Sequence, residues 1–183
     1  MRARPATIFA VVAVLAAGCS AFEIDAPKPV PIAPTEKIDS AAPAPEALEK
    51  FKGSKAPTDY IIVEAAMEGD RDKPWIALHV RPATADGAII KAPGRFTFRL
   101  FREDTRKPRY EGGLVGSWSI GGEDALKLWY GGFWTEGYVL RLNLEDLGVE
   151  NQRRYILVTT FTPLYSPALS QTSYLKAGLA PQE

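Results

Sequence analysis

Residues 95–102 have the sequence RFTFRLFR, in which apolar and polar side chains alternate. In an extended chain Phe96, Phe98 and Leu100 point to one side, and the residues between them point to the other. This alternation is typical of a β-strand that covers a core with one face and meets water with the other. We therefore expect this segment to be a strand of an antiparallel sheet.

Similar runs of β-branched, aromatic and alternating residues lie on both sides of this segment. Glycine-containing turn pairs, such as those at 86–87 and 93–94, separate them. A short helix is expected at 123–130, between two pairs of glycines and with acids in its first turn. The pattern predicts an all-β fold over residues 59–178: an antiparallel, Ig-like or C2-like β-sandwich of about seven strands. The expected strands are 60–63, 75–80, 95–102, 137–144, 155–162 and 172–176, with a short one near 116–120.

Composition excludes several classes of protein. The 183 residues contain 22 Lys and Arg against 22 Asp and Glu, which argues against a nucleic-acid-binding protein. A single cysteine excludes an internal disulfide framework and a cysteine-rich zinc site. A single histidine makes a histidine metal cluster or a Ser-His-Asp triad hard to build. We expect no cofactor, no metal and no enzymatic activity.

The N-terminus has the features of an export signal. Arg2 and Arg4 precede an apolar run at 8–17 that is too short to span a membrane. The run ends in LAAGC at 15–19, which resembles the bacterial lipobox. The resemblance implies that residues 1–18 are removed and that Cys19 carries a diacylglycerol and a further acyl chain such as palmitate, enough for a stable anchor. Ser20 implies sorting to the outer membrane.

Removal of residues 1–18 would leave 20 basic and 22 acidic side chains, a net charge of −2. Residues 19–58 are rich in proline and alanine, and proline lacks a backbone donor. We expect them to form a disordered tether with polyproline II character and no regular ladder, or alternatively a partner-binding proline-rich peptide. Residues 179–183 are expected to be a tail.

Five aromatic side chains lie within residues 129–138, and this cluster offers a second hypothesis for function. Exposed tryptophans in a β-sandwich can stack on sugar rings, so the cluster suits a carbohydrate-binding module, whereas large aromatics also commonly fill cores. Exposure decides between the two. The candidate binding residues are Trp118, Trp129, Tyr130 and Trp134.

Arg95 and Arg99 are the remaining candidate binding residues, and both lie on the polar side of the 95–102 segment. Basic residues on an exposed strand guard against edge-to-edge pairing. The alternative is an anionic partner, such as lipid headgroups or surface polysaccharide.

Other polar residues are weaker candidates. The lone histidine, His79, is expected to be structural or to lie on the surface. Glu68, Asp70 and Asp72 form either a solvated turn or a Ca²⁺ site between two strands. A hydrolase would need acids such as Glu68, Asp70 or Glu136 as bases.

Several features together resemble a group of uncharacterised bacterial lipoproteins with an Ig-like sandwich. They are IKAPG at 90–94 leading into the strand at 96–101, Trp118, Trp129, and GYVLRL at 137–142. The resemblance implies a fold and no activity. We therefore expect a membrane-anchored envelope lipoprotein whose sandwich is a non-enzymatic binding or structural module for a protein partner. The carbohydrate-binding module is the alternative, and a hydrolase is a third possibility.

Overall fold

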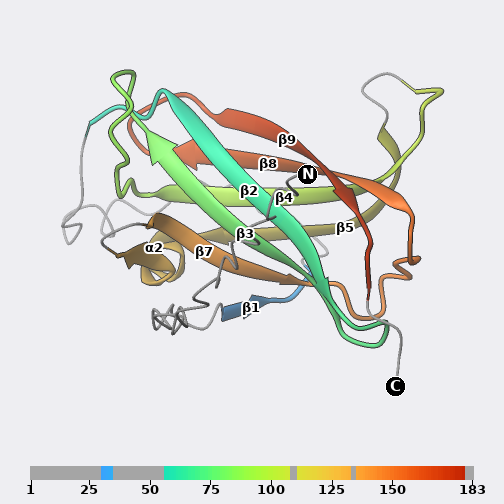
Figure 1. Ribbon diagram of the computed structural model, residues 1–183. Coiled ribbons are helices and arrows are strands. Elements are labelled where there is room, and N and C mark those ends of the chain that lie inside the picture. Colours follow the sequence, from blue (N-terminus) through green and yellow to red (C-terminus); the bar gives the residue numbers. More distant parts are fainter. Residues whose placement is uncertain (1–29, 35–55, 108–110, 133–134, 180–183) are drawn as a thin grey trace, which may run out of the picture.

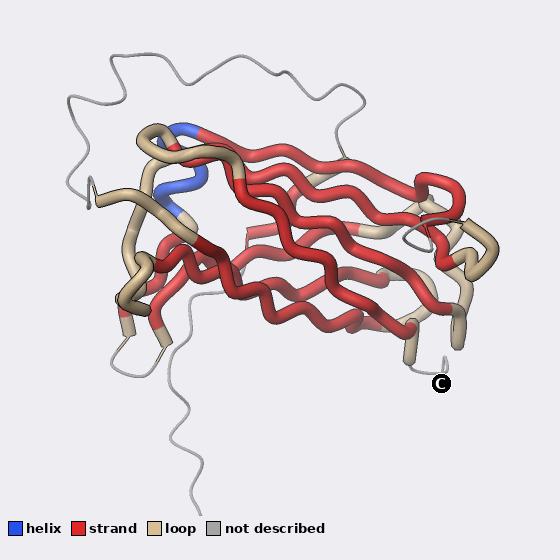
Figure 2. The backbone as a smooth tube through the Cα atoms, turned by 90° about the horizontal axis from the view of Figure 1, so that it is seen from above, coloured by secondary structure: helices blue, strands red, loops and turns tan. Residues whose placement is uncertain are grey.

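The alternating segments pair into two sheets that pack face to face as a β-sandwich (Figure 1). The computed structural model describes residues 30–34, 56–107, 111–132 and 135–179. One sheet has the order β1-β7-β3-β2, with β6 also paired to β7, and the other has the order β5-β4-β8-β9. A short helix, α2 (Gly122–Lys127), lies at one end of the sandwich (Figure 2). The strands are β1 (Val30–Ile32), β2 (Tyr60–Gly69), β3 (Pro74–Ala83), β4 (Gly94–Glu103), β5 (Glu111–Gly121), β6 (Trp129–Gly131), β7 (Glu136–Asn143), β8 (Arg154–Pro163) and β9 (Leu169–Lys176).

The expected all-β sandwich is confirmed, and so is the side-chain alternation of its strands. Phe96, Phe98 and Leu100 of β4 are fully buried between the sheets, as expected for the apolar side of that segment. The inward residues of β3 and β7 are buried in the same way. All pairs are antiparallel except β1 with β7.

Aromatic rings form the centre of the core. Phe96 stacks on Phe161 with ring centroids 4.5 Å apart, and the edge of Tyr138 meets it at 4.8 Å. The Tyr138 hydroxyl donates a 2.5 Å hydrogen bond to the carbonyl of Ala92, so the one polar atom of this buried ring is satisfied. These rings come from both sheets and hold the two layers together.

A side chain of β9 bonds to the backbone of one residue, Val63, at the edge of β2. The carboxamide of Gln171 on β9 accepts from the Val63 amide at 3.0 Å and donates to the Val63 carbonyl at 3.3 Å. It thereby occupies bonding positions that a neighbouring strand would otherwise fill. At the start of the domain, the Thr58 amide donates to the Ser166 hydroxyl at 2.8 Å.

The prediction that no regular ladder forms between residues 19 and 58 is wrong at β1. Val30–Ile32 pairs in parallel with Leu140–Leu142 of β7, along the edge that faces away from β3. Pro31 is exposed on this edge strand, where its missing donor costs least, while Ile32 is buried in the core. Burial of one isoleucine and pairing with a free strand edge outweigh the proline content of the segment.

The expected helix at 123–130 is too long at its C-terminal end. The helix ends at Lys127, and Trp129–Gly131 forms β6, which pairs with Glu136–Tyr138 on the same edge of β7 that β1 covers further along. Aromatic residues favour a pleated surface with a packing partner. Trp129 finds one in Tyr138, whose ring centroid lies 5.0 Å away.

The folded part also extends past the expected boundary at 178. Leu179 is buried, and its amide and carbonyl are both hydrogen-bonded to the side chain of Asn151. The prediction that the tail begins at 179 therefore needs correction by one residue.

Candidate functional site

The outer face of the β2–β3–β7 sheet gathers polar and aromatic side chains that the strand register aligns in rows. One row holds Glu64, His79 and Val139, and the next holds Ala66, Ala77 and Arg141. A third row holds Glu68, Trp75 and Asn143. Because successive residues of a strand point to opposite faces, all of these side chains point away from the core.

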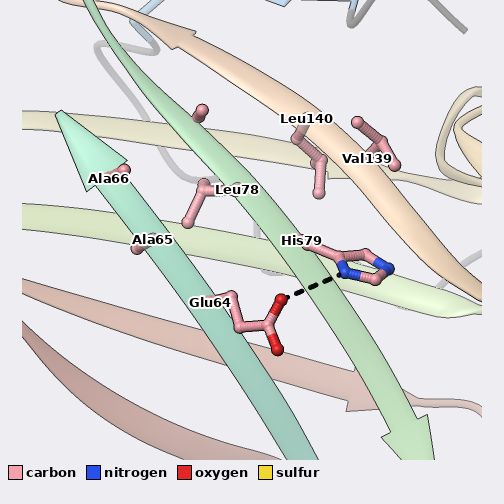
Figure 3. A pocket seen from close by; sticks show the side chains of 8 residues that line it. Glu64, Ala65, Ala66, Leu78, His79, Val139 and Leu140 are labelled. Atoms are coloured by element: carbon pink, nitrogen blue, oxygen red, sulfur yellow. Dashed lines mark hydrogen bonds and ion pairs between the residues drawn. The ribbon is translucent and has the colours of Figure 1, made fainter. Parts of the chain in front are cut away.

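Glu64 joins the lone histidine to an arginine. Its carboxylate lies 3.4 Å from His79 Nδ1 and also accepts from the Arg81 guanidinium. His79 Nε2 lies 3.2 Å from the Glu136 carbonyl oxygen, on β7. Both partners of the ring are acceptors, so a neutral imidazole can donate to only one of them at a time. Figure 3 shows His79 and Glu64 facing each other across β2 and β3.

A shallow, open depression of about 330 Å³ lies beside this pair. Small side chains, including Ala66 and Ala77, line it together with His79 and Val139. Figure 3 shows where Ala66, His79 and Val139 lie. Gly137 allows His79 to approach β7 closely: its φ is +153°, and a Cβ there would lie 2.5 Å from His79 Nε2. A depression that is open to solvent can receive a protruding side chain of a partner.

A second cluster surrounds Trp75 on the same face. The Arg141 guanidinium carbon lies 3.6 Å from the ring centroid, close enough for a cation–π interaction, and the indole nitrogen donates to Glu68 at 3.2 Å. Gly69, with φ +94°, allows the close approach of the backbone to the ring, since a Cβ there would lie 2.6 Å from it. The two clusters present a pre-ordered surface on either side of the alanines.

The six candidate binding residues predicted from the sequence do not form one site in the structure. Trp118 is fully buried, because it lies on the inward side of β5 opposite Phe98, so its assignment as a binding residue is wrong. Trp129 is half-buried against Tyr138, and Tyr130 is half-buried beside Gly132. Trp134 lies outside the described residues.

Arg95 and Arg99 do lie together on an outward face, that of the opposite sheet, beside β5 and β8. Neither belongs to the face that carries His79 and Trp75. Trp75 and His79 occupy alternate positions of β3, on the side opposite the buried Ile76 and Leu78. Arg141 was missed, although its alternation with Leu140 and Leu142 was a signal for an outward position.

The acidic residues of the β2–β3 turn do not converge on one point. Asp70 Oδ1 accepts from the backbone amides of Asp72 and Lys73 at 3.0 and 2.7 Å, whereas the Glu68 carboxylate is turned to Trp75. In the described part of the chain, no group of three or more His, Cys, Asp and Glu side chains is placed to hold a metal ion.

Cys19 and the apolar run before it lie outside the described residues. Among the residues that are described, no helix has the length and hydropathy needed to cross a bilayer. Comparison of the chain with protein-family models, with curated proteins and with solved structures found no match.

Proposed function

We propose that this protein is an outer-membrane lipoprotein, anchored through acylated Cys19, whose β-sandwich is a non-enzymatic binding module for a protein partner. The lipobox-like LAAGC at 15–19 supports the anchor. Two or more acyl chains on one cysteine suffice to hold a protein at a bilayer. The mature protein then faces the periplasm or the cell surface.

The observation that carries the binding role is the outer face of β2, β3 and β7. Tryptophan, histidine and arginine side chains lie there at fixed positions around an open alanine floor. Tryptophan and arginine are enriched among the residues that contribute most to protein–protein binding. Glu68 contacts Trp75, and Glu64 contacts His79 and Arg81. These contacts hold the side chains in place before a partner binds, which lowers the entropy cost of association.

The carbohydrate-binding alternative has less support. Of its aromatic residues, Trp118 is in the core and Trp129 packs on Tyr138. A hydrolase also has little support, since Glu136 meets His79 through its carbonyl rather than its carboxylate. Neither alternative has a set of convergent side chains comparable to the Trp75 and His79 clusters.

Cys19→Ser tests the anchor. We expect the native chain to sediment with membranes after a high-salt wash and to enter the detergent phase, because its acyl chains insert irrespective of salt. The Cys19→Ser chain should move to the salt-soluble fraction, while the control Ser20→Ala stays with the membranes. A Cys19→Ser chain that still enters the detergent phase would refute acylation at this residue.

A photo-reactive amino acid at Ala66 tests the binding face. Ala66 and Ala88 are both exposed alanines, but only Ala66 lies between the two clusters. We expect ultraviolet irradiation of cells to join position 66 to a discrete partner protein, and position 88 to give no such product. The product should fall at least tenfold when Arg141→Gln removes the cation above Trp75. Equal products from both positions would contradict a specific face.

A further inference from the structure

The outer face of the second sheet carries an apolar row that crosses all four strands. The register aligns Leu114 of β5, Phe101 of β4, Ile156 of β8 and Tyr174 of β9. Leu114 is 58% exposed and Tyr174 is 62% exposed, among the highest values for large apolar residues in the described chain. Ile156 points outward with them but is fully covered by its neighbours. Large side chains therefore protrude at both ends of this row.

Basic side chains surround the apolar row. Arg99, in the neighbouring row, has its guanidinium carbon 6.0 Å from the Phe101 ring centroid, and Arg95 lies four residues before Arg99 on the same strand. On the other side of the row are Arg154 and Lys176, which are partners in the register of β8 and β9. Two acids accompany them in the same row: Glu103, 14% exposed and 3.3 Å from Arg154, and its register partner Glu111 on β5.

The formal charges on this face sum to +2, from four basic residues and two acids. The opposite outer face, with Glu64, Glu68, Arg81 and Arg141, sums to zero when His79 is neutral. A further row of the positive face is made entirely of hydroxyl groups, which can donate to phosphate and ester oxygens. The row consists of Ser119, Thr97, Thr160 and Ser170.

We propose that the β5–β4–β8–β9 face rests on an anionic lipid surface, with Leu114 and Tyr174 at the headgroup level and the arginines among the phosphates. Tyrosine favours the membrane interface, and basic residues are attracted to anionic lipids. An acidic protein would also meet the charge. The lipid surface is favoured because the anchor, on which this inference rests, already holds the domain beside it.

The chain between anchor and sandwich is short enough for this contact. Only residues 20–29 separate Cys19 from β1, because Val30–Ile32 is part of the first sheet. Ten residues reach at most about 35 Å, roughly one domain diameter. With the positive face on the bilayer, the face that carries Trp75 and His79 points away from it and is accessible to a partner.

Vesicle binding by the mature Cys19→Ser chain tests the inference apart from the anchor. We expect it to bind vesicles of phosphatidylcholine with one quarter phosphatidylglycerol, and not vesicles of phosphatidylcholine alone. Each basic side chain at the surface contributes about fivefold in partition. The double variant Arg95→Gln/Arg99→Gln should therefore bind about 25-fold more weakly, and Tyr174→Ser should also weaken binding.

The matched control is Arg71→Gln/Lys73→Gln, which removes the same charge from the exposed β2–β3 turn and should change binding less than twofold. Circular dichroism verifies that each variant is folded. Absence of vesicle binding by the folded chain, or an equal loss in both double variants, would overturn the inference. Thr172 of β9 lies in the same row as Arg99 and is exposed. A photo-reactive amino acid at Thr172 that cross-links to a protein, in a chain that does not bind vesicles, would also overturn the inference. Acylation of Cys19 is measured separately by fractionation, so either proposal can fail alone.

Discussion

Tyr138 is the residue with the most demanding environment in the core. Its ring meets Phe96 and Trp129 edge-on, and its hydroxyl is buried against the Ala92 carbonyl. Burial raises the pKa of Tyr138 well above its ordinary value, because the phenolate would lose its hydration; the hydrogen bond with Ala92 opposes this only in part. The folded protein therefore keeps this hydroxyl protonated at pH values where the unfolded chain ionises.

Tyr138→Phe should remove an alkaline instability. Above a pH of about 10 the unfolded chain loses the Tyr138 proton and the folded protein retains it, so the free energy of unfolding falls by up to about 1.4 kcal/mol per pH unit. We expect Tyr138→Phe to be about 1 kcal/mol less stable at neutral pH, from the lost hydrogen bond, but to show a shallower decline above pH 10. Urea titrations on both sides of this pH measure the difference.

Tyr174→Phe is the control for this measurement, since Tyr174 is largely exposed and should leave the alkaline decline unchanged. A Tyr138→Phe decline as steep as that of the native chain would contradict the role of Tyr138.

At the scale of single residues, the sequence predicts which way a side chain points better than it predicts which residues the side chain contacts. Alternation correctly placed Phe96 and Arg99 on opposite sides of their strand, with Phe96 inward. It cannot show that Arg141 covers Trp75, because the two residues lie 66 positions apart in the chain and meet only through the register of β3 and β7. Trp118 was wrongly assigned because the assignment rested on aromatic content alone. The number of aromatic residues in a segment does not show which of them are buried.

At the scale of elements, the seven expected strands are present, and the two that were not expected lie along one edge of β7. Both β1 and β6 are three residues long, too short for a periodic pattern to be recognised. β1 also contains proline, which normally counts against a strand. Each forms because β7 offers an edge whose backbone groups need partners, a fact of tertiary structure that no local pattern contains.

Ile32→Ala tests whether β1 is an integral part of the sandwich. Its buried side chain contributes to the core, so we expect the substitution to lower the free energy of unfolding by about 2 to 3 kcal/mol. Pro31→Ala, at the exposed neighbouring position, should change it by less than about 0.5 kcal/mol. Urea denaturation of the two variants measures both values, and equal stability of Ile32→Ala and the native chain would show that β1 does not pack on the sandwich.

At the scale of the whole molecule, an even charge count conceals two different surfaces. The chain has as many basic as acidic residues, yet one outer face is balanced within itself and the other carries an excess of two positive charges. Composition argued only against nucleic acid as a partner. The arrangement of charges distinguishes the two faces, and it supports the proposals that one face meets an anionic surface and the other a protein.

The contacts made at the two edges of the first sheet have a consequence for how the protein folds. β1 pairs with β7, whose residues follow it by 110 positions, and Val63 of β2 bonds to Gln171, 108 positions later. During synthesis the edges of β1 and β2 therefore stay unpaired until β7 and β9, respectively, have been made. Contacts of such high sequence separation form slowly, and open strand edges are prone to aggregation. Productive folding should accordingly depend on protection of the nascent chain until its last strand is available.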